Sequence, residues 1–470
     1  MQQANRFLFY AAVTVLASAF AFTGLGAAWL YTSDAGTSLR RELQQRTPNE
    51  WLRYTLRRLE GHNKLEFVAH PVLHTLQQRL EREPPYPLPS LGKGQQATAL
   101  HSLGNTAERL IAVTDAQQLR EAMRQADAGT RIQIAPGVYR LERKLQTGRA
   151  GLPGQAIVLS AEAPGTVWLE FTQAEGIVVD KPHWTIENLG MRGVCPRHDD
   201  CEHALHVVGP AAFSVIRNNR LEDFNAHIKV NGLRGQWPDH GLLAFNTLTN
   251  SRARETAKPV VPFDLVGANH WRVEDNHVSH FVKRHGNGVS YGMYMKGASE
   301  GGRFERNLVV CSPHGVSAPG VRVGLSFGGG GTGASFCRDG RCATHEHLNG
   351  HMVNNIVAHC NDTGIDINQS TGVQVLHNTL INTSGLATRG SLAQAVAASN
   401  LIEGRMVSRD GSALVQEHNK MLDADLVFTN ADALEFKWRK EPSAYSISPV
   451  PANDFYGKAR SGSSVPGATQ

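Results

Sequence analysis

The chain has 470 residues, of which 19% are charged and 7% aromatic, so neither a disordered chain nor a disulfide-rich miniprotein is indicated. Its 46 glycines suit a β protein with many turns. The formal net charge of +5 is small and the Lys and Arg residues are spread out, so nucleic acid is not a favoured partner. An acidic polymer or an anionic surface stays open as a partner.

An uncharged segment opens the chain. Residues 7–31 contain no charged side chain, and this length can cross a bilayer core of about 30 Å. We therefore predict an N-terminal transmembrane anchor or signal segment over residues 1–32, with the uncleaved anchor preferred and a signal peptide cut after Ala28 as the alternative. Both readings place the rest of the chain in the periplasm or outside the cell, and the first makes it membrane-anchored.

Three segments outside the repeat region have distinct patterns. Residues 33–83 carry leucines such as Leu52 and Leu56 at helical spacing and predict a short helical stalk, with a basic membrane-surface helix as the alternative. Residues 84–106 predict a Pro/Gly-rich linker. Residues 431–470 predict a C-terminal extension that is partly disordered.

A sequence pattern typical of the start of a helix follows the predicted linker. Asp115 is the expected N-cap of a helix over residues 117–127, whose Leu119 and Ala122 share one face. Residues 129–139 then predict a strand, a Pro-Gly turn and a second strand. A helix in this place fits an end cap, which a solenoid needs because its first coil otherwise exposes an apolar end and unpaired strand edges.

Asparagines recur along the last two-thirds of the chain at spacings of 31, 27, 30, 31, 48, 23, 22 and 19 residues. They are Asn188, Asn219, Asn246, Asn276, Asn307, Asn355, Asn378, Asn400 and Asn419. A repeat of this length indicates stacked coils rather than one globular core. We predict an all-β solenoid, a parallel β-helix, over residues 107–430, in which the asparagines form a ladder of hydrogen bonds between coils.

A short strand with alternating apolar and polar residues recurs between the asparagines, as in Ile228–Asn231 and Ile365–Asn368. Stacking the coils would align its outward side chains along one face. These side chains belong to Lys229, Asn231, Asp264, Tyr294, Lys296, Ser326, Asp366, Asn368 and Arg389. Their mixture of charges and amides predicts a polar groove, with an ordinary solvated sheet face as the alternative.

The 48-residue gap between Asn307 and Asn355 interrupts the repeat and predicts a loop on one face of the solenoid. Its glycine run, residues 328–331, lacks the Lys-Ser/Thr and the βαβ context of a phosphate loop. We expect these glycines to let a bulky polymer approach the backbone.

One triplet in this gap resembles a metal site. His345-Glu346-His347 does not have the spacing of the zinc motif H-E-x-x-H, so zinc is disfavoured. Glu346 with Asp366 and Asn368 would supply the oxygen ligands that calcium prefers. We predict Ca²⁺ at these three residues, with surface hydrogen bonding as the alternative.

Six cysteines agree with an oxidising compartment. Two pairs bracket short turns, and a third pair follows equivalent asparagines and could meet between coils. The three pairs are Cys195 with Cys201, Cys337 with Cys342, and Cys311 with Cys360. Buried free thiols are the alternative, and the lack of a C-x-x-C pair disfavours zinc.

The cap motif of residues 129–139 and coil motifs such as Gly364–Asn368 resemble right-handed parallel β-helix proteins that act on carbohydrates, most closely the chondroitinase B-like and alginate lyase-like branch. The resemblance covers about two-thirds of the chain and implies a lyase activity on acidic polysaccharide. It implies a strand lysine as base, which Lys296 matches, and calcium held partly by a Glu-x-Glu pair. No such pair lies near Lys296; the one in the chain is Glu81–Glu83, in the predicted stalk.

The expected chemistry is β-elimination at a uronate, in which a base removes the proton beside a carboxylate that a cation neutralises. We assign Lys296 as base, Tyr294 as proton relay or leaving-group acid, and Arg322 and Arg389 as carboxylate clamps. The expected substrate-binding residues are Lys229, Asn231, Asp264, Ser326 and Arg389. A non-catalytic polysaccharide-binding envelope protein is the alternative, as is a hydrolase or epimerase, for which Asp264 and Asp366 would be the carboxylates.

Overall fold

The computed structural model of the chain describes residues 52, 72–73, 75–76, 88–94, 109–312, 316, 319–329, 332–421, 424, 427–431, 433–440, 451–460 and 465–469. The chain divides into two compact units, one made of residues 1–83 and 315–317 and the other of residues 84–314 and 318–470. In the first unit the described residues between 52 and 76 are helical. The second unit carries all the strands discussed below.

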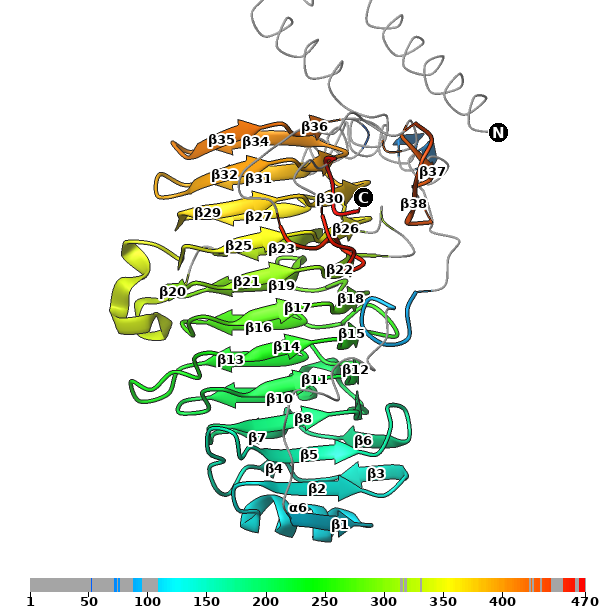
Figure 1. Cartoon of the computed structure of the whole chain (residues 1–470), viewed down its shortest axis with the longest axis vertical. Coiled ribbons are helices and arrows are strands. Elements are labelled where there is room, and N and C mark those ends of the chain that lie inside the picture. The colour runs from blue at the N-terminus through cyan, green and yellow to red at the C-terminus, as the bar shows by residue number, and fades with distance from the viewer. Residues whose placement is uncertain are drawn as a thin grey trace, which may run out of the picture. The chain divides into compact units, whose positions relative to one another are not determined.

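Three long parallel sheets form the second unit, and each turn of the chain visits them in a constant order (Figure 1). Sheet 1 has 12 strands: β1 (Arg109–Val113), β2 (Thr130–Ile134), β5 (Ile157–Ala161), β8 (Trp184–Glu187), β11 (Val215–Arg217), β14 (Leu242–Ala244), β17 (Arg272–Glu274), β21 (Arg303–Glu305), β25 (His351–Val353), β29 (Val373–Leu376), β32 (Gln394–Ala398) and β35 (Ala413–Glu417). Sheet 2 has 11 strands: β3 (Gly137–Leu141), β6 (Val167–Phe171), β9 (Gly190–Gly193), β12 (Arg220–Glu222), β15 (Thr247–Thr249), β18 (His277–Ser279), β22 (Leu308–Val310), β26 (Ile356–Ala358), β30 (Thr379–Ile381), β33 (Leu401–Ile402) and β36 (Lys420–Met421).

Sheet 3 completes each coil and is the sheet on which the candidate site lies. It has 10 strands: β4 (Leu145–Gln146), β7 (Glu175–Val179), β10 (His203–Val208), β13 (Ile228–Asn231), β16 (Phe263–Val266), β19 (Val289–Lys296), β23 (Val321–Phe327), β27 (Ile365–Asn368), β31 (Gly385–Arg389) and β34 (Arg405–Arg409). Strands β20 (Ser299–Glu300), β24 (His347–Leu348) and β28 (Ser370–Thr371) form a small sheet, and β37 (Phe428–Asn430) pairs antiparallel with β38 (Glu435–Trp438). The predicted parallel β-helix is therefore confirmed, whereas its right-handed winding stays a prediction.

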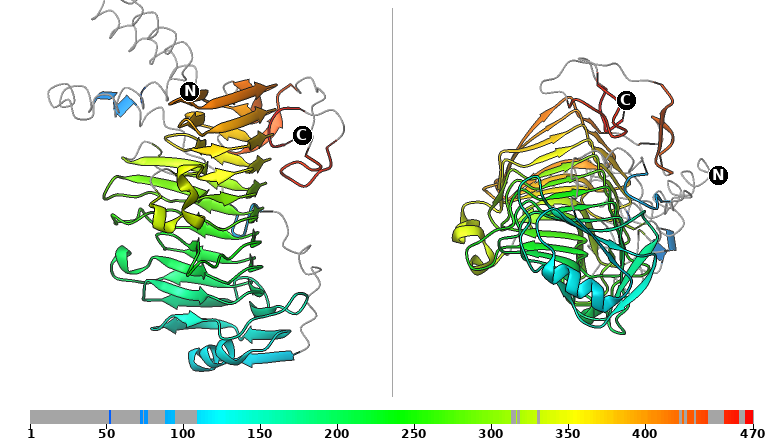
Figure 2. Two further views of the ribbon diagram at one scale, coloured as in Figure 1. Left: turned by 90° about the vertical axis from the view of Figure 1, so that its left-hand side faces the viewer. Right: turned by 60° about the horizontal axis from the view of Figure 1, so that its bottom comes forward.

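A helix covers the first coil, as the helix-start pattern at Asp115 predicts (Figure 2). Helix α6 (Ala116–Gln125) begins after Asp115, whose Oδ1 accepts hydrogen bonds from the backbone N–H of Gln117 and Gln118, both at 2.8 Å. The helix buries Leu119, Ala122 and Met123 against the coil. This cap protects the apolar end of the solenoid from water.

The interior of the coils is apolar because one side chain per strand stacks on its equivalent in the next coil. In sheet 1 the aligned column is Ile186, Ile216, Leu243, Val273, Phe304, Met352, Val375 and Ala397, each at most 1% exposed. Burying one such large side chain contributes roughly 1.5–3 kcal/mol. The core therefore runs along the solenoid axis as a stack rather than converging on one centre.

The asparagine ladder is present from Asn219 to Asn419. In each step the backbone N–H and the side-chain Nδ2 of one asparagine donate to Oδ1 of the next, as at Asn276 to Asn307, with distances of 3.1 and 3.0 Å. Asn188 does not belong to the ladder: Leu189 occupies its place, donating its N–H to Asn219 Oδ1 at 3.0 Å. Asn188 instead has φ of +64°, a left-handed conformation that asparagine tolerates. The sequence prediction was thus wrong by one position for the first coil.

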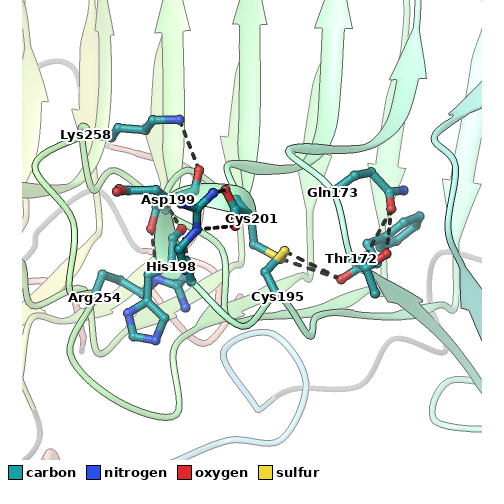
Figure 3. Close-up of a disulfide and its surroundings, with 12 residues drawn as sticks. Thr172, Gln173, Cys195, His198, Asp199, Cys201, Arg254 and Lys258 are labelled. Atoms are coloured by element: carbon teal, nitrogen blue, oxygen red, sulfur yellow. Dashed lines mark hydrogen bonds and ion pairs between the residues drawn. A yellow bond between two sulfur atoms is a disulfide. The ribbon is translucent and has the colours of Figure 1, made fainter.

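All three expected cysteine pairs are disulfides: Cys195–Cys201, Cys311–Cys360 and Cys337–Cys342. The first lies in the loop before β10, next to a second loop that follows β15 (Figure 3). There the Lys258 Nζ donates to the carbonyl oxygen of Asp199 at 3.0 Å. Because Pro259 follows directly and lines the groove described below, these contacts brace one side of that groove.

The outer face of sheet 2 is covered by segments from both ends of this unit. Phe428, Phe436 and Phe455 pack on strands β22, β26, β30 and β33. Lys93, from the predicted linker, pairs with Asp275 at 2.6 Å between Nζ and Oδ1. These described parts of the linker and the C-terminal extension are therefore packed on the solenoid.

No helix in the described part of the chain is long and apolar enough to cross a membrane. The predicted anchor or signal segment over residues 1–32 lies outside the described residues. The anchor thus remains a prediction from sequence.

Candidate functional site

The register of sheet 3 aligns the predicted polar side chains into columns. One column runs through Lys229, Asp264, Tyr294, Ser326 and Asp366, one residue per strand from β13 to β27. A neighbouring column contains Asn231, Val266 and Lys296 and, two coils farther on, Asn368 and Arg389. The columns arise because residues of the same strand parity face the same side of a sheet.

Part of this face forms a groove of about 480 Å³. This volume suits a small ligand or a few sugar units. The lining side chains come from Lys229, Asn231, Leu233, Arg234, Trp237, Pro259, Asp264, Val266, Tyr294, Lys296, Thr332, Ser335 and Phe336. Of the predicted site residues, the groove therefore gathers Lys229, Asn231, Asp264, Tyr294 and Lys296.

Lys229 and Asp264 form an ion pair on the groove floor, with 2.8 Å between Nζ and Oδ1. Asp264 is 4% exposed, and burial alone would raise the pKa of its carboxyl. The charges of Lys229 and Lys296 outweigh burial and lower the Asp264 pKa below its usual range. Asp264 is therefore a fixed carboxylate that partly neutralises two lysines.

Lys296 ends strand β19 and lies one coil beyond Asp264. Burial lowers the pKa of its ammonium, Asp264 and Glu346 raise it, and the charge of Lys229 lowers it, with a net lowering. Its Nζ lies 4.7 Å from the centre of the Tyr294 ring. The backbone of Gly329 passes close by, since a Cβ on that glycine would lie 3.4 Å from Lys296 Cδ. Lys296 is thus held in place and is more easily deprotonated than an ordinary lysine.

Tyr294 is 5% exposed and hydrogen-bonds Asp264. Burial raises its pKa well above the usual range, and the nearby Asp264 carboxylate raises it further. The phenol therefore keeps its proton at neutral pH and is a donor rather than a base.

Trp237 forms one wall of the groove and was not singled out from the sequence. Its indole packs against the backbone of two coils, because a Cβ on Gly232 or Gly267 would lie only 2.5 or 2.1 Å from the ring. The guanidinium carbon of Arg338 lies 5.4 Å from the ring centre. The sequence signal for this wall is a glycine directly after each of two strands, Gly232 after β13 and Gly267 after β16, because a glycine leaves room for an aromatic ring.

The second wall comes from Thr332, Gly333, Ser335 and Phe336. They belong to residues 332–346, an insertion that projects beside β20 in Figure 1 and is part of the predicted loop. Two side chains attach this insertion to the coils. Arg338 Nη1 and Nη2 donate to the Asp239 carboxylate at 2.8 and 2.9 Å. Glu346 Oε2 accepts from the Gly297 N–H and from the Thr332 hydroxyl, both at 2.9 Å. The insertion is therefore a fixed wall that forms part of the groove.

Arg322 and Ser326 do not line the groove. Arg322 lies opposite Ser290, six residues before Lys296 along the neighbouring strand, or about 20 Å of extended chain. Its side chain is 1% exposed and donates to the Pro319 carbonyl oxygen at 3.2 Å. Ser326 is fully buried and donates to the Gly328 carbonyl oxygen at 2.5 Å. The geometry thus separates both residues from Lys296.

Asp366 and Arg389 form a separate ion pair farther along sheet 3. Arg389 Nε and Nη2 donate to the two carboxylate oxygens of Asp366 at 2.9 and 2.5 Å. Burial raises the Asp366 pKa although Arg389 opposes this. Asp366 lies three coils from Asp264, about 14 Å along the axis, which exceeds the separation of a glycosidase carboxylate pair. These two aspartates therefore do not fit the predicted hydrolase pair.

The three residues predicted to bind calcium have different surroundings. Both oxygens of Asp366 accept from Arg389, and Glu346 binds Gly297 and Thr332 in the insertion. Among the described residues, no group of three or more His, Cys, Asp and Glu side chains is placed to hold a metal ion. Glu346, Asp366 and Asn368 thus do not fit one shared calcium site.

No protein-family model and no curated protein matches this chain. The chain is similar to solved structures of carbohydrate-active proteins. They include pectate lyase Pel9A, at 13% identity, TM-score 0.47, and coverage of 76% of this chain and 88% of that one. A PL6-family polysaccharide lyase from Pseudopedobacter saltans is 12% identical with TM-score 0.37, covering 71% of this chain and 97% of that one.

A glycoside hydrolase also appears among the similar structures. GH136 lacto-N-biosidase from Eubacterium ramulus is 12% identical with TM-score 0.46, covering 67% of this chain and 68% of that one. The expected resemblance to carbohydrate-active β-helix proteins is thus found. Similarities of this size do not transfer an activity to this chain.

Proposed function

We propose that this protein acts on an acidic polysaccharide by β-elimination at a uronate unit, with Lys296 as the base. The observation that carries the proposal is the groove that gathers Lys296, Lys229 and Tyr294, with Lys296 Nζ 4.7 Å from the centre of the Tyr294 ring. Burial in this groove lowers the pKa of Lys296 and raises the pKa of Tyr294, which keeps its proton. A lysine must be neutral to accept a proton, and burial makes the neutral form accessible.

The reaction divides among three groove residues. Lys296 Nζ takes the proton from the carbon beside the carboxylate, and the C–H electron pair becomes the new double bond while the glycosidic C–O bond breaks. The Tyr294 hydroxyl gives its proton to the leaving oxygen, because an alkoxide is more basic than a phenolate. Lys229 faces the substrate carboxylate, whose negative charge grows in the transition state. The clamp role expected of Arg322 and Arg389 therefore passes to Lys229, with the exposed Arg234 at the rim.

The experiment is a panel of pectate, alginate, chondroitin and other acidic glycans incubated with the full chain. The expected result is a rise in ultraviolet absorbance from an unsaturated uronate with at least one glycan. Parallel reactions with added Ca²⁺ and with a chelator test the calcium prediction separately. Binding to a glycan without any unsaturated product would contradict the lyase proposal and favour the non-catalytic polysaccharide-binding protein.

We also propose that the β-helix lies in the periplasm or outside the cell, anchored through residues 1–32. Three disulfides among the described residues support an oxidising compartment. Fractionation of expressing cells, with protease added from outside, tests this proposal. A soluble chain with reduced cysteines in the cytoplasm would contradict it.

A further inference from the structure

The groove has an apolar side that the elimination steps do not use. Phe336 is 70% exposed and Leu233 is 50% exposed, and both line the groove together with Trp237. Phe336 is the most exposed large apolar side chain in the described part of the chain. Exposed apolar side chains that gather at one groove indicate a binding surface.

Arg338 fixes this apolar side across three successive coils. Its guanidinium binds the carboxylate of Asp239, which lies in the loop after β13. The guanidinium also donates to the carbonyl oxygen of Gly267, which directly follows β16, at 3.1 Å. Its backbone N–H donates to the Gly297 carbonyl oxygen at 2.8 Å, after β19. The Cys337–Cys342 disulfide closes the short loop that contains Arg338 and follows Phe336. Trp237 and Phe336 thus lie in the same groove, and Arg338 connects the segments that carry them.

We propose that Trp237 and Phe336 bind the apolar C–H face of a sugar ring adjacent to the uronate that reacts at Lys296, and that Arg338 is a positioning residue for this wall. An aromatic ring offers a flat apolar surface at low entropic cost, which suits the C–H face of a pyranose. Lys229 and Lys296, which line the same groove, bind the acid group of the reacting uronate. The ligand is therefore an acidic oligosaccharide of at least two rings rather than a free sugar acid. This inference rests on the proposed function.

The test measures binding without turnover, in a Lys296→Ala background, by calorimetry with tetrasaccharides prepared from the glycan that gives product. Phe336→Ser is expected to weaken tetrasaccharide binding roughly three- to tenfold, whereas Phe336→Tyr retains it. Leu152→Ser is the matched control, since Leu152 is 54% exposed and lies outside the groove lining. Binding of the free monosaccharide acid is expected to be the same in all four proteins.

A double-mutant cycle separates positioning from general stability. Arg338→Met is expected to weaken tetrasaccharide binding about as much as Phe336→Ser, and the double variant no more than the larger single loss, because both changes act through the same ring. Thermal unfolding of each variant shows whether the coils stay folded. Unchanged affinity in Phe336→Ser, or additive losses in the double variant, would overturn this inference alone. No binding of any acidic glycan by the unmodified chain would overturn the proposed function as well.

Discussion

Two kinds of polar column run along the solenoid, the asparagine ladder and the outward columns of sheet 3, and they differ in how regularly their side chains repeat. The asparagine ladder repeats one neutral amide in successive coils, and each amide is satisfied by its neighbours. The outward column of sheet 3 changes from Lys229 to Asp264 to Tyr294 over three strands. Regular repetition of a side chain marks a structural role here, whereas its variation from coil to coil marks the place where chemistry is possible.

The largest expected effect is a loss of activity on changing Lys296, which lies in an outward column of sheet 3. Lys296→Ala should lower the elimination rate about 10²- to 10⁴-fold, because it removes the base, and should leave the unfolding midpoint nearly unchanged. Product absorbance and thermal unfolding measure the two effects. Lys181→Ala is the matched control, since Lys181 lies outside the groove and is paired with Asp180 at 3.1 Å. Equal activity in the two variants would remove Lys296 from its role.

A change in the asparagine ladder should lower stability and leave activity largely intact, the opposite of the effect of Lys296→Ala. Asn307→Ala removes the Oδ1 that accepts from Asn276 and the Nδ2 that donates to Val273 and Asn355. The free energy of unfolding should fall by about 3 kcal/mol, because several buried groups lose their partners. In a denaturant titration, the variant should keep its activity at denaturant concentrations well below its unfolding midpoint. Asn188→Gly, at a left-handed position outside the ladder, should cost less than about 1 kcal/mol in the same denaturant titration.

The charges around Lys296 predict opposite shifts in the pH–rate profile. A general base is active when deprotonated, so the rate rises as pH passes its pKa. Lys229→Met removes a charge that lowers the Lys296 pKa, so the rising limb should move to higher pH. Asp264→Asn removes a charge that raises that pKa, so the limb should move to lower pH. Shifts in the same direction would contradict the assignment of the base.

The smallest expected effect concerns Asp366, a charged member of the outward column that does not line the groove. Burial raises its pKa in the folded chain, so its contribution to stability is present at acidic pH and is lost as pH rises through the folded pKa. Because Arg389 is 35% exposed and water can solvate its charge, Asp366→Asn should change the unfolding free energy by less than about 1 kcal/mol at neutral pH, well below the loss expected for a fully buried ion pair. Relative to the unmodified chain, the variant should be less stable at acidic pH than at neutral pH. Urea titrations at the two pH values measure this difference.

The repeat predicts the coils well because each ladder asparagine and each outward strand has the same local pattern. It does so less well at the boundary, where Leu189 takes the ladder position and Asn188 only precedes it. The coil that contains β10 was not anticipated in the outward column. Its His206 lies opposite Lys229 and bonds Glu175 and Asn231 at 2.6 and 2.8 Å.

The walls of the groove depend on contacts between distant segments, which a strand pattern does not contain. Arg338 meets Asp239 across 99 residues of chain. Arg322 illustrates the opposite failure, because its charge suggests a ligand contact while its position on the strand buries it away from Lys296. Strand alternation predicts which side chains share a face, but only the packing of the insertion shows which of them face a cavity.

The asparagine ladder has a direction. From Asn219 to Asn400 each side-chain Nδ2 donates to the asparagine Oδ1 of the next coil toward the C-terminus. Nδ2 also donates to a backbone carbonyl oxygen of the preceding coil, as at Asn307 to Val273. Hydrogen bonds in such a row polarise one another. The bonds from asparagine to asparagine therefore all run one way along the solenoid axis, although the parallel strands run across that axis. A substitution in the middle of the row divides this chain of hydrogen bonds in two, whereas a substitution at Asn419 only shortens it.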